Sequence, residues 1–266
     1  MSRSVRLVFL SLACFFLLFP LAVPRPGMPP TLKADEPAYY LMAQSLARDG
    51  DLVCDSGDLR RLFDDYPHLP VDNLILKSED GWQTVHFGKP YLYSLLAAPA
   101  VLAFGARGMV AFNMLLLLVM VWMGFSYLKR HNDEPAAAVF SAVFFFLSPV
   151  FVYVFWLQPE ILNMFGVAAC LYLGLTRSDT NTDTEPREDV GLERASGPDR
   201  PTEQRPSRWE ALVKVPFGPG ARLCGSAAAL SLAVYNKPMF AALGIPVLWF
   251  LWRRRGWRSV VAWMLA

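Results

Sequence analysis

The sequence has few cysteines, and no two of them show the Cys-x-x-Cys spacing of zinc and redox sites. The four are Cys14, Cys54, Cys170 and Cys224. All except Cys54 lie in or beside apolar runs, so the sequence indicates neither a zinc site nor a disulfide framework. The formal net charge is only +2, so the sequence also lacks the basic excess expected of a protein that binds nucleic acid.

Apolar residues, in contrast, are abundant. They make up 54% of the 266 residues, and the mean hydropathy is +0.31. This composition is too apolar for an ordinary soluble domain and predicts several membrane spans. Basic residues stand at the ends of the apolar runs, where they set the orientation of a membrane protein. We therefore expect an all-α, polytopic helical membrane protein with about six transmembrane helices.

The first apolar run covers residues 7–23 and follows Arg3 and Arg6. Its length, roughly 17 residues, is adequate for a tilted span. A cleaved signal peptide would have the same basic start, but the sequence has no clear small-x-small cleavage site. We predict an uncleaved first span with the N-terminus on the cytoplasmic side.

A polar segment, residues 25–88, follows and is expected to form an outer loop. Within it we predict a helix from Pro37 to about Asp49, because proline suits a first turn and Gly50 favours the end. The apolar residues of this helix fall near one face, so we expect it to lie flat on the membrane. Asp35 and Glu36 put two adjacent carboxylates at its start. Helix capping is one role for this pair, and chemistry at the membrane surface is the other.

Residues 52–79 are predicted to be irregular. They include Asp64-Asp65-Tyr66-Pro67-His68, which carries residue types found in metal sites. A solvated loop is the more common structure for such a segment, and a loop is our prediction.

The next apolar stretch, residues 91–104, has about 14 residues and is short for a span. It either crosses the membrane or forms a juxtamembrane or re-entrant helix. The positive-inside rule favours the second topology, because Lys129-Arg130 and Arg253-Arg254-Arg255 then lie on the inner side. The remaining predicted spans are residues 109–128, 136–156, 161–175, 223–235 and 239–252.

This topology gathers the charged candidates on one outer side: Asp35, Glu36, His86, Lys89, Glu160 and Lys237. Residues 176–221 are polar and are predicted to form a disordered inner loop. Residues 222–266 hold further transmembrane helices. The apolar run after Arg258 has about eight residues, too few for a span, so we expect the chain to be a fragment.

The order of features in residues 1–175 carries a resemblance. A span is followed by Asp35-Glu36-Pro37-Ala38-Tyr39, a long outer loop, and a half-helix that begins near Lys89-Pro90-Tyr91-Leu92 and ends at Phe104-Gly105. A span with a basic inner end comes next, and two further spans joined by an acidic outer turn follow it. This order resembles the N-terminal part of the GT-C glycosyltransferases and is most similar to the protein O-mannosyltransferase and aminoarabinose-transferase group.

The resemblance implies a membrane-bound glycosyltransferase. Such an enzyme moves a sugar from a polyprenyl-phosphate donor to a protein, lipid or polysaccharide acceptor. The site would lie on the extracytoplasmic face of the plasma or inner membrane. Asp35 corresponds to the catalytic base, and Glu36 would orient the acceptor or share a divalent cation with Asp35 and Glu160. The requirement for a metal stays open.

The resemblance also assigns the remaining candidates. Glu160 takes the place of the family's later acidic residue, and Tyr91 replaces the second proline of its Lys-Pro-Pro-Leu segment. Aromatic side chains such as Tyr91 would stack on the sugar. The leaving phosphate needs cationic donors, and the candidates are His86, Lys89 and Lys237.

Each of these residues also has a simpler role. Lys89 and Lys237 are placed to snorkel at helix ends, and Tyr91 to anchor the chain at the membrane interface. His86 would then be an exposed loop residue and Glu160 a polar turn residue. Two other functions stay open as well: a transporter or flippase-like protein, and a non-catalytic remnant or scaffold.

Overall fold

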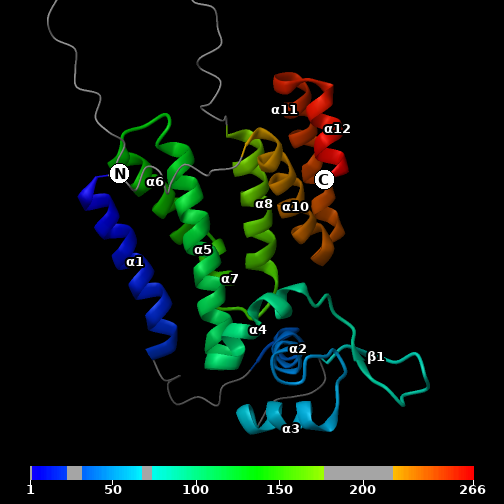
Figure 1. Ribbon diagram of the computed structural model, residues 1–266. Helices are drawn as coiled ribbons and strands as arrows, with labels where there is room; N and C mark the ends of the chain where they lie inside the picture. Colours follow the sequence, from blue (N-terminus) through cyan, green and yellow to red (C-terminus); the bar gives the residue numbers. More distant parts are fainter. Residues whose placement is uncertain (1, 23–31, 68–73, 177–217) are drawn as a thin grey trace, which may run out of the picture.

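Most of the chain forms a bundle of helices. The computed structural model describes residues 2–22, 32–67, 74–176 and 218–266. The helices of the bundle run beside one another (Figure 1). They are α1 (Arg3–Ala22), α5 (Ala106–Leu128), α6 (Glu134–Phe146), α8 (Glu160–Leu175), α10 (Pro219–Asn236), α11 (Gly244–Arg255) and α12 (Trp257–Leu265). The expectation of a helical fold is therefore confirmed. The predicted inner loop, residues 176–221, lies almost wholly outside the described residues.

A second group of elements covers one end of the bundle, which we call the α2 end. It contains α2 (Glu36–Arg48), α3 (Ser56–Asp65), α4 (Leu92–Phe104) and the antiparallel strands β1 (Leu76–Lys77) and β2 (His86–Phe87). Figure 1 views α2 along its axis while the bundle helices run up and down. The helix therefore lies across the end of the bundle.

The predicted helix after Asp35 is confirmed, but its surroundings differ from the prediction. The structure buries α2 from Glu36 to Ser45, between α4 on one side and α3 on the other. It is therefore not a helix with one face open to lipid. Gly50 follows its end with φ of +77°, a conformation that glycine adopts without strain. Asp35 is the N-cap residue, yet its side chain makes no capping hydrogen bond.

The prediction of an irregular chain over residues 52–79 is wrong in part, because α3 lies within it. Asp55 and Asp58 form a capping box, in which each carboxylate accepts a hydrogen bond from the backbone N–H of the other residue. This pair of bonds satisfies donors at the helix start that are otherwise unpaired. Asp64 and Asp65 therefore lie on a helix, and His68 lies outside the described residues.

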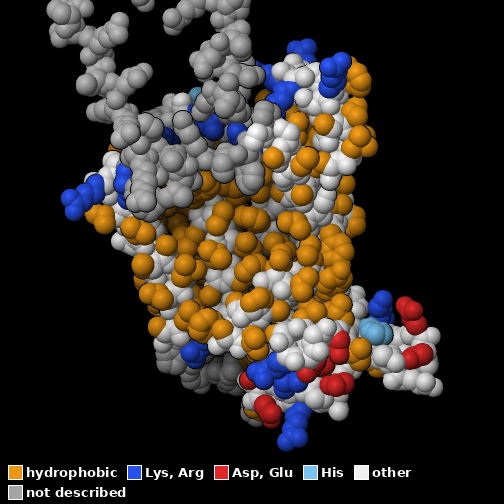
Figure 2. Space-filling view, in the orientation of Figure 1, with side chains coloured by type: hydrophobic (Ala, Val, Ile, Leu, Met, Phe, Trp, Pro, Cys, Tyr) orange, Lys and Arg blue, Asp and Glu red, His pale blue; other side chains and the backbone are white. Residues whose placement is uncertain are grey.

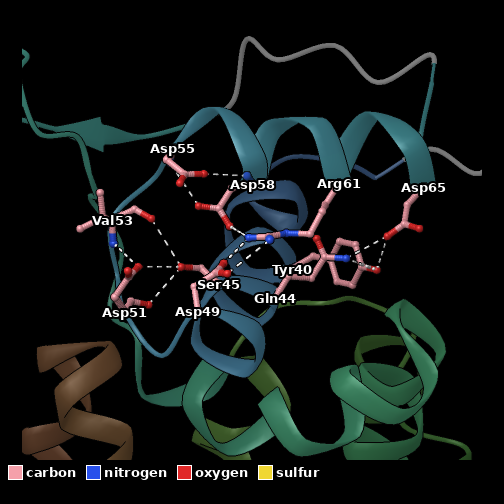
Figure 3. Close-up of polar contacts among 10 residues, drawn as sticks. All are labelled: Tyr40, Gln44, Ser45, Asp49, Asp51, Val53, Asp55, Asp58, Arg61 and Asp65. Carbon is pink, nitrogen blue, oxygen red and sulfur yellow. Dashed lines mark hydrogen bonds and ion pairs between the residues drawn. The ribbon is translucent and has the colours of Figure 1, made fainter.

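Polar contacts hold α3 against α2 (Figure 3). Arg61 of α3 pairs with Asp58 on its own helix and with Asp49 just after α2. At the other end of α3, Asp65 accepts hydrogen bonds from Tyr40 and Gln44 of α2, at 2.7 and 2.9 Å. Asp58 is buried, so its carboxylate depends on these protein partners. Helix α3 is therefore an ordered layer that packs on α2.

The predicted span over residues 136–156 is broken. Helix α6 ends at Phe146, and the short α7 (Val150–Tyr153) begins after Pro149. Proline has no backbone N–H and clashes with the preceding turn, so a continuous helix is disfavoured here. The predicted span 239–252 likewise begins as a 3₁₀ helix, η2 (Pro238–Leu243), before α11.

Helix α4 turns back into α5 at a tight glycine corner. Gly105 has φ of +58°, and a Cβ on Gly108 would lie 2.0 Å from the carbonyl oxygen of Ala100. Only glycine allows the two helices to approach so closely. The predicted short helix is confirmed, and it packs along α2.

Charge is distributed unevenly between the two ends of the bundle (Figure 2). Acidic side chains gather at the α2 end, while the opposite end carries Arg253 to Arg255 beyond a broad apolar band. Among the described residues, α1 and α5 are long and apolar enough to cross a membrane, and α4, α6 and α8 are apolar but shorter. Such helices also occur as signal sequences and in soluble cores, so by themselves they are weak evidence for a membrane protein.

Loss of the Asp58 carboxylate should release α3. Asp58→Ala removes one half of the capping box and one partner of Arg61. We expect the local opening of α3 to become easier by about 2 kcal/mol, which is roughly a 30-fold faster amide exchange. Hydrogen exchange followed by mass spectrometry measures this change. Asp64→Ala, an exposed change on the same helix, is the matched control. Equal exchange in the two variants would contradict the role of Asp58 in holding α3.

Candidate functional site

Five of the seven residues singled out in the sequence contribute to one place at the α2 end. The chain segments that meet there are the start of α2, the residues before α4, the start of α8 and the end of α10. Two lysine–carboxylate pairs mark this candidate site.

The first pair joins Asp35 to Lys89. The Lys89 Nζ lies 2.7 Å from Asp35 Oδ2, across 54 residues of sequence. The two side chains are 36% and 20% exposed, so the pair is reached by solvent. The preceding residue, Ala34, has φ of +50°, which is unfavourable for a residue with a Cβ. The chain therefore accepts a strained residue where it leads into Asp35.

The second pair joins Glu160 to Lys237. Glu160 begins α8, Lys237 directly follows α10, and the Nζ to Oε1 distance is 2.8 Å. The Glu160 side chain is only 17% exposed. Its other oxygen, Oε2, is buried and has no hydrogen-bond partner among the described residues. One carboxylate oxygen is thus paired, and the other is left without a partner among the described residues.

Tyr39 lies near both acidic groups. Its side chain is buried in α2, and burial raises the pKa of the hydroxyl well above its usual range. The carboxylates of Asp35 and Glu160 raise that pKa further, which places both negative charges close to the phenol. Tyr39 therefore stays protonated at physiological pH and supplies a neutral hydroxyl near both acids.

An aromatic pair connects the segments that carry the two lysines. Tyr91 and Tyr235 meet edge to face with ring centroids 5.7 Å apart. They are 41% and 45% exposed, so their rings also face the surroundings. Tyr91 is two residues after Lys89, and Tyr235 is two residues before Lys237. The contact therefore keeps both cationic residues on the same side of the molecule.

Glu36 is in a different environment from its neighbour Asp35. It is 8% exposed, and both of its oxygens accept backbone hydrogen bonds. Oε2 accepts from Lys33 at 2.7 Å, and Oε1 accepts from Leu157 in the turn before α8 at 3.0 Å. These contacts favour a structural role. The predicted role of Glu36 in orienting an acceptor stays a prediction.

The turn before α8 has a second support. The Asn113 amide in α5 donates to the carbonyls of Val154 and Trp156, and its oxygen accepts from Tyr93 in α4. Asn113 is fully buried, so these bonds satisfy it completely in an apolar setting. Together with Glu36 it fixes the backbone that leads into Glu160.

His86 lies apart from the two pairs. It belongs to β2, where it faces Lys77 of β1 and also bridges to Val53. Among the described residues its side chain makes no hydrogen bond or ion pair. Its predicted phosphate role has no geometric support.

Sequence reasoning missed Asn163 and Asn236. In the described part of the chain, both amide atoms of Asn163 are buried without a hydrogen-bond partner, and so is the Asn236 Oδ1. The sequence did offer a signal for Asn163, because it is a single polar residue in an apolar run, three positions after Glu160. No group of three or more His, Cys, Asp or Glu that could hold a metal occurs among the described residues. The sharing of a divalent cation by Asp35, Glu36 and Glu160 stays a prediction.

Comparison with known proteins gives no relative for this chain. No protein family matches it, and no curated protein or solved structure matches at a significant level.

The two neighbouring carboxylates should respond differently to loss of charge. Glu36→Gln replaces one acceptor oxygen with an amide that faces a backbone N–H, so we expect a loss of about 2–3 kcal/mol of stability. Asp35→Asn removes only a partly exposed ion pair and should cost about 1 kcal/mol or less. Chemical unfolding in bicelles measures both variants. Equal losses would contradict the assignment of Glu36 as the structural member.

Proposed function

We propose that this protein transfers a sugar from a polyprenyl-phosphate donor to an acceptor hydroxyl or amine. The observation that carries the proposal is the meeting of the Asp35–Lys89 and Glu160–Lys237 pairs beside Tyr39, at one end of an apolar bundle. A lipid-linked sugar phosphate needs both cationic groups and an apolar surface. This end of the molecule supplies both.

Asp35 is the proposed base. It is the more exposed of the two adjacent carboxylates, and Lys89 is its side-chain partner among the described residues. In the reaction the acceptor oxygen or nitrogen forms a bond to the anomeric carbon, and its proton passes to Asp35. The bond between that carbon and the phosphate oxygen breaks, and its electron pair stays on the phosphate.

Lys89 and Lys237 are the proposed phosphate contacts. The leaving phosphate gains negative charge, and a positioned ammonium group stabilises that charge in the transition state. Each lysine is held by a carboxylate, so each is fixed before the donor arrives. Preorganised donors of this kind lose little energy to rearrangement during the reaction.

The proposal requires a membrane. We infer that the bundle spans the plasma or inner membrane, with the N-terminus in the cytoplasm and the α2 end outside. Apolar side chains exposed on α4, including Leu95, Leu96 and Leu102, offer a surface for the polyprenyl tail. The basic cluster at Arg253 to Arg255, at the end of the bundle opposite α2, supports this orientation.

Loss of the proposed base should abolish transfer. Asp35→Asn keeps the shape of the side chain but cannot accept the acceptor proton, so we expect at least a 100-fold loss of turnover with unchanged membrane insertion. Transfer of radiolabelled sugar from a polyprenyl-phosphate donor in membranes measures this. Asp64→Asn, exposed on α3, is the control. Normal turnover in Asp35→Asn would refute the assignment of the base.

The proposed orientation predicts which positions a membrane-impermeant maleimide can reach. In a background with the native cysteines replaced by alanine, Glu79→Cys on the outer hairpin should react in intact cells, because this side chain is 87% exposed. Arg254→Cys at the opposite end should react only after lysis. Labelling of both positions, or of Arg254→Cys alone, in intact cells would contradict the topology.

A further inference from the structure

Unpaired buried polar atoms are concentrated beside the second ion pair. Asn163 is 1% exposed, and neither its Nδ2 nor its Oδ1 has a hydrogen-bond partner among the described residues. The same holds for Glu160 Oε2 and Asn236 Oδ1. Buried polar groups in native proteins are almost always paired, because an unpaired one costs folding free energy. Four such atoms on three neighbouring residues therefore need an explanation.

The three residues belong to one contact between helices. Figure 1 shows α8 and α10 side by side. On α8, Glu160 pairs with Lys237 after the end of α10, and Gly166 packs against Ala229 and Ala233 of α10. Asn163 lies three residues from each of Glu160 and Gly166, so it falls on the same helix face, between these two contacts.

Asn236 approaches the same place from the other helix. It is the last residue of α10 and directly precedes Lys237. Its Nδ2 donates to the Leu232 carbonyl at 3.1 Å, which leaves its oxygen as the unpaired atom. The two asparagines and Glu160 therefore offer three acceptor oxygens and one amide donor group at the end of the α8–α10 contact.

This set of atoms selects among ligand chemistries. Three unpaired oxygens repel a phosphate, and an apolar tail gives them no partner. A metal ion is disfavoured, because Lys237 already neutralises the Glu160 carboxylate at 2.8 Å. Hydroxyl groups fit best, since each can donate to an oxygen and accept from an N–H. Several hydroxyls fixed on one ring would match several of these atoms at once.

We propose that Asn163, Asn236 and Glu160 bind the ring hydroxyls of the donor sugar, and that Asn163 determines which sugar is accepted. The inference rests on the proposed function. Glu160 pairs with Lys237, and the contact between Tyr91 and Tyr235 brings the Lys237 segment beside the Lys89 segment. Lys89 pairs with Asp35, so a sugar held here is near the proposed base. A site built to pair with hydroxyls discriminates strongly against ligands that lack them, because its own buried atoms are then left unpaired.

The test compares binding with and without the sugar. The purified full chain in bicelles is titrated with polyprenyl phosphate and with polyprenyl-phosphate mannose, glucose and galactose, and the rise in melting temperature gives the affinities. In the wild type at least one sugar-bearing lipid should bind more tightly than polyprenyl phosphate. Asn163→Leu keeps the number of side-chain heavy atoms but removes both polar ones. It should bind that lipid about tenfold more weakly, with unchanged affinity for polyprenyl phosphate.

The same variant separates a ligand site from an ordinary structural residue. Asn163→Leu without ligand should melt at a higher temperature than the wild type, because an unpaired amide has been removed. Ser126→Ala is the matched control, since it removes another buried unpaired group on a different helix and should leave sugar affinity unchanged. If the leucine does not fit, Asn163→Ala tests the same loss of hydrogen bonds.

The outcomes distinguish failure of the subsite from failure of the proposed function. Unchanged sugar affinity in both Asn163 variants would overturn the subsite. Equal wild-type affinity for polyprenyl phosphate with and without sugar would also overturn it, while leaving the phosphate contacts of the proposed function in place. If the wild type binds none of these lipids, the proposed function fails, and the inference fails with it.

Discussion

The arrangement of the candidate site depends on one buried carboxylate. Glu36 accepts hydrogen bonds from the backbone of Lys33 and from that of Leu157, a residue 121 positions further along the chain. The second bond ties the start of α2 to the turn that leads into α8. Asn113 secures the carbonyls of the same turn from α5. A buried carboxyl group needs hydrogen-bond donors from the protein, and the Leu157 N–H supplies one. Glu36 in turn fixes the backbone of the turn that contains Leu157.

This connection explains how charged groups gather at the end of an apolar bundle. With the turn fixed, Glu160 begins α8 where Lys237 can reach it, and Asp35 at the start of α2 meets Lys89. Tyr39 lies near both acids as a neutral hydroxyl. The layer formed by α2 and α3 covers this end of the bundle with polar contacts (Figure 3). The proposed function is therefore placed where two lysine–carboxylate pairs meet at this end of the bundle.

Local chemistry made several elements predictable. Pro37 and Gly50 mark the start and the end of α2, and both predictions are confirmed to within a residue or two. The short α4 was expected from its length. In contrast, α3 was missed because its only strong signal is a capping box in an otherwise polar segment. The break at Pro149 was missed because the apolar run continues through it, and hydropathy does not register a lost N–H.

The sequence by itself predicted the ends of α2, α4 and α8 to within about one residue. Start and stop signals act within a few residues, so the local sequence is enough to place these ends. Only the tertiary structure decided which of two adjacent carboxylates is buried and which is open to solvent. Asp35 and Glu36 have the same chemistry and the same local context, but their partners, Lys89 and Leu157, come from distant segments. It also decided that Asn163 is unpaired, since the atoms that surround a buried amide are supplied by other helices.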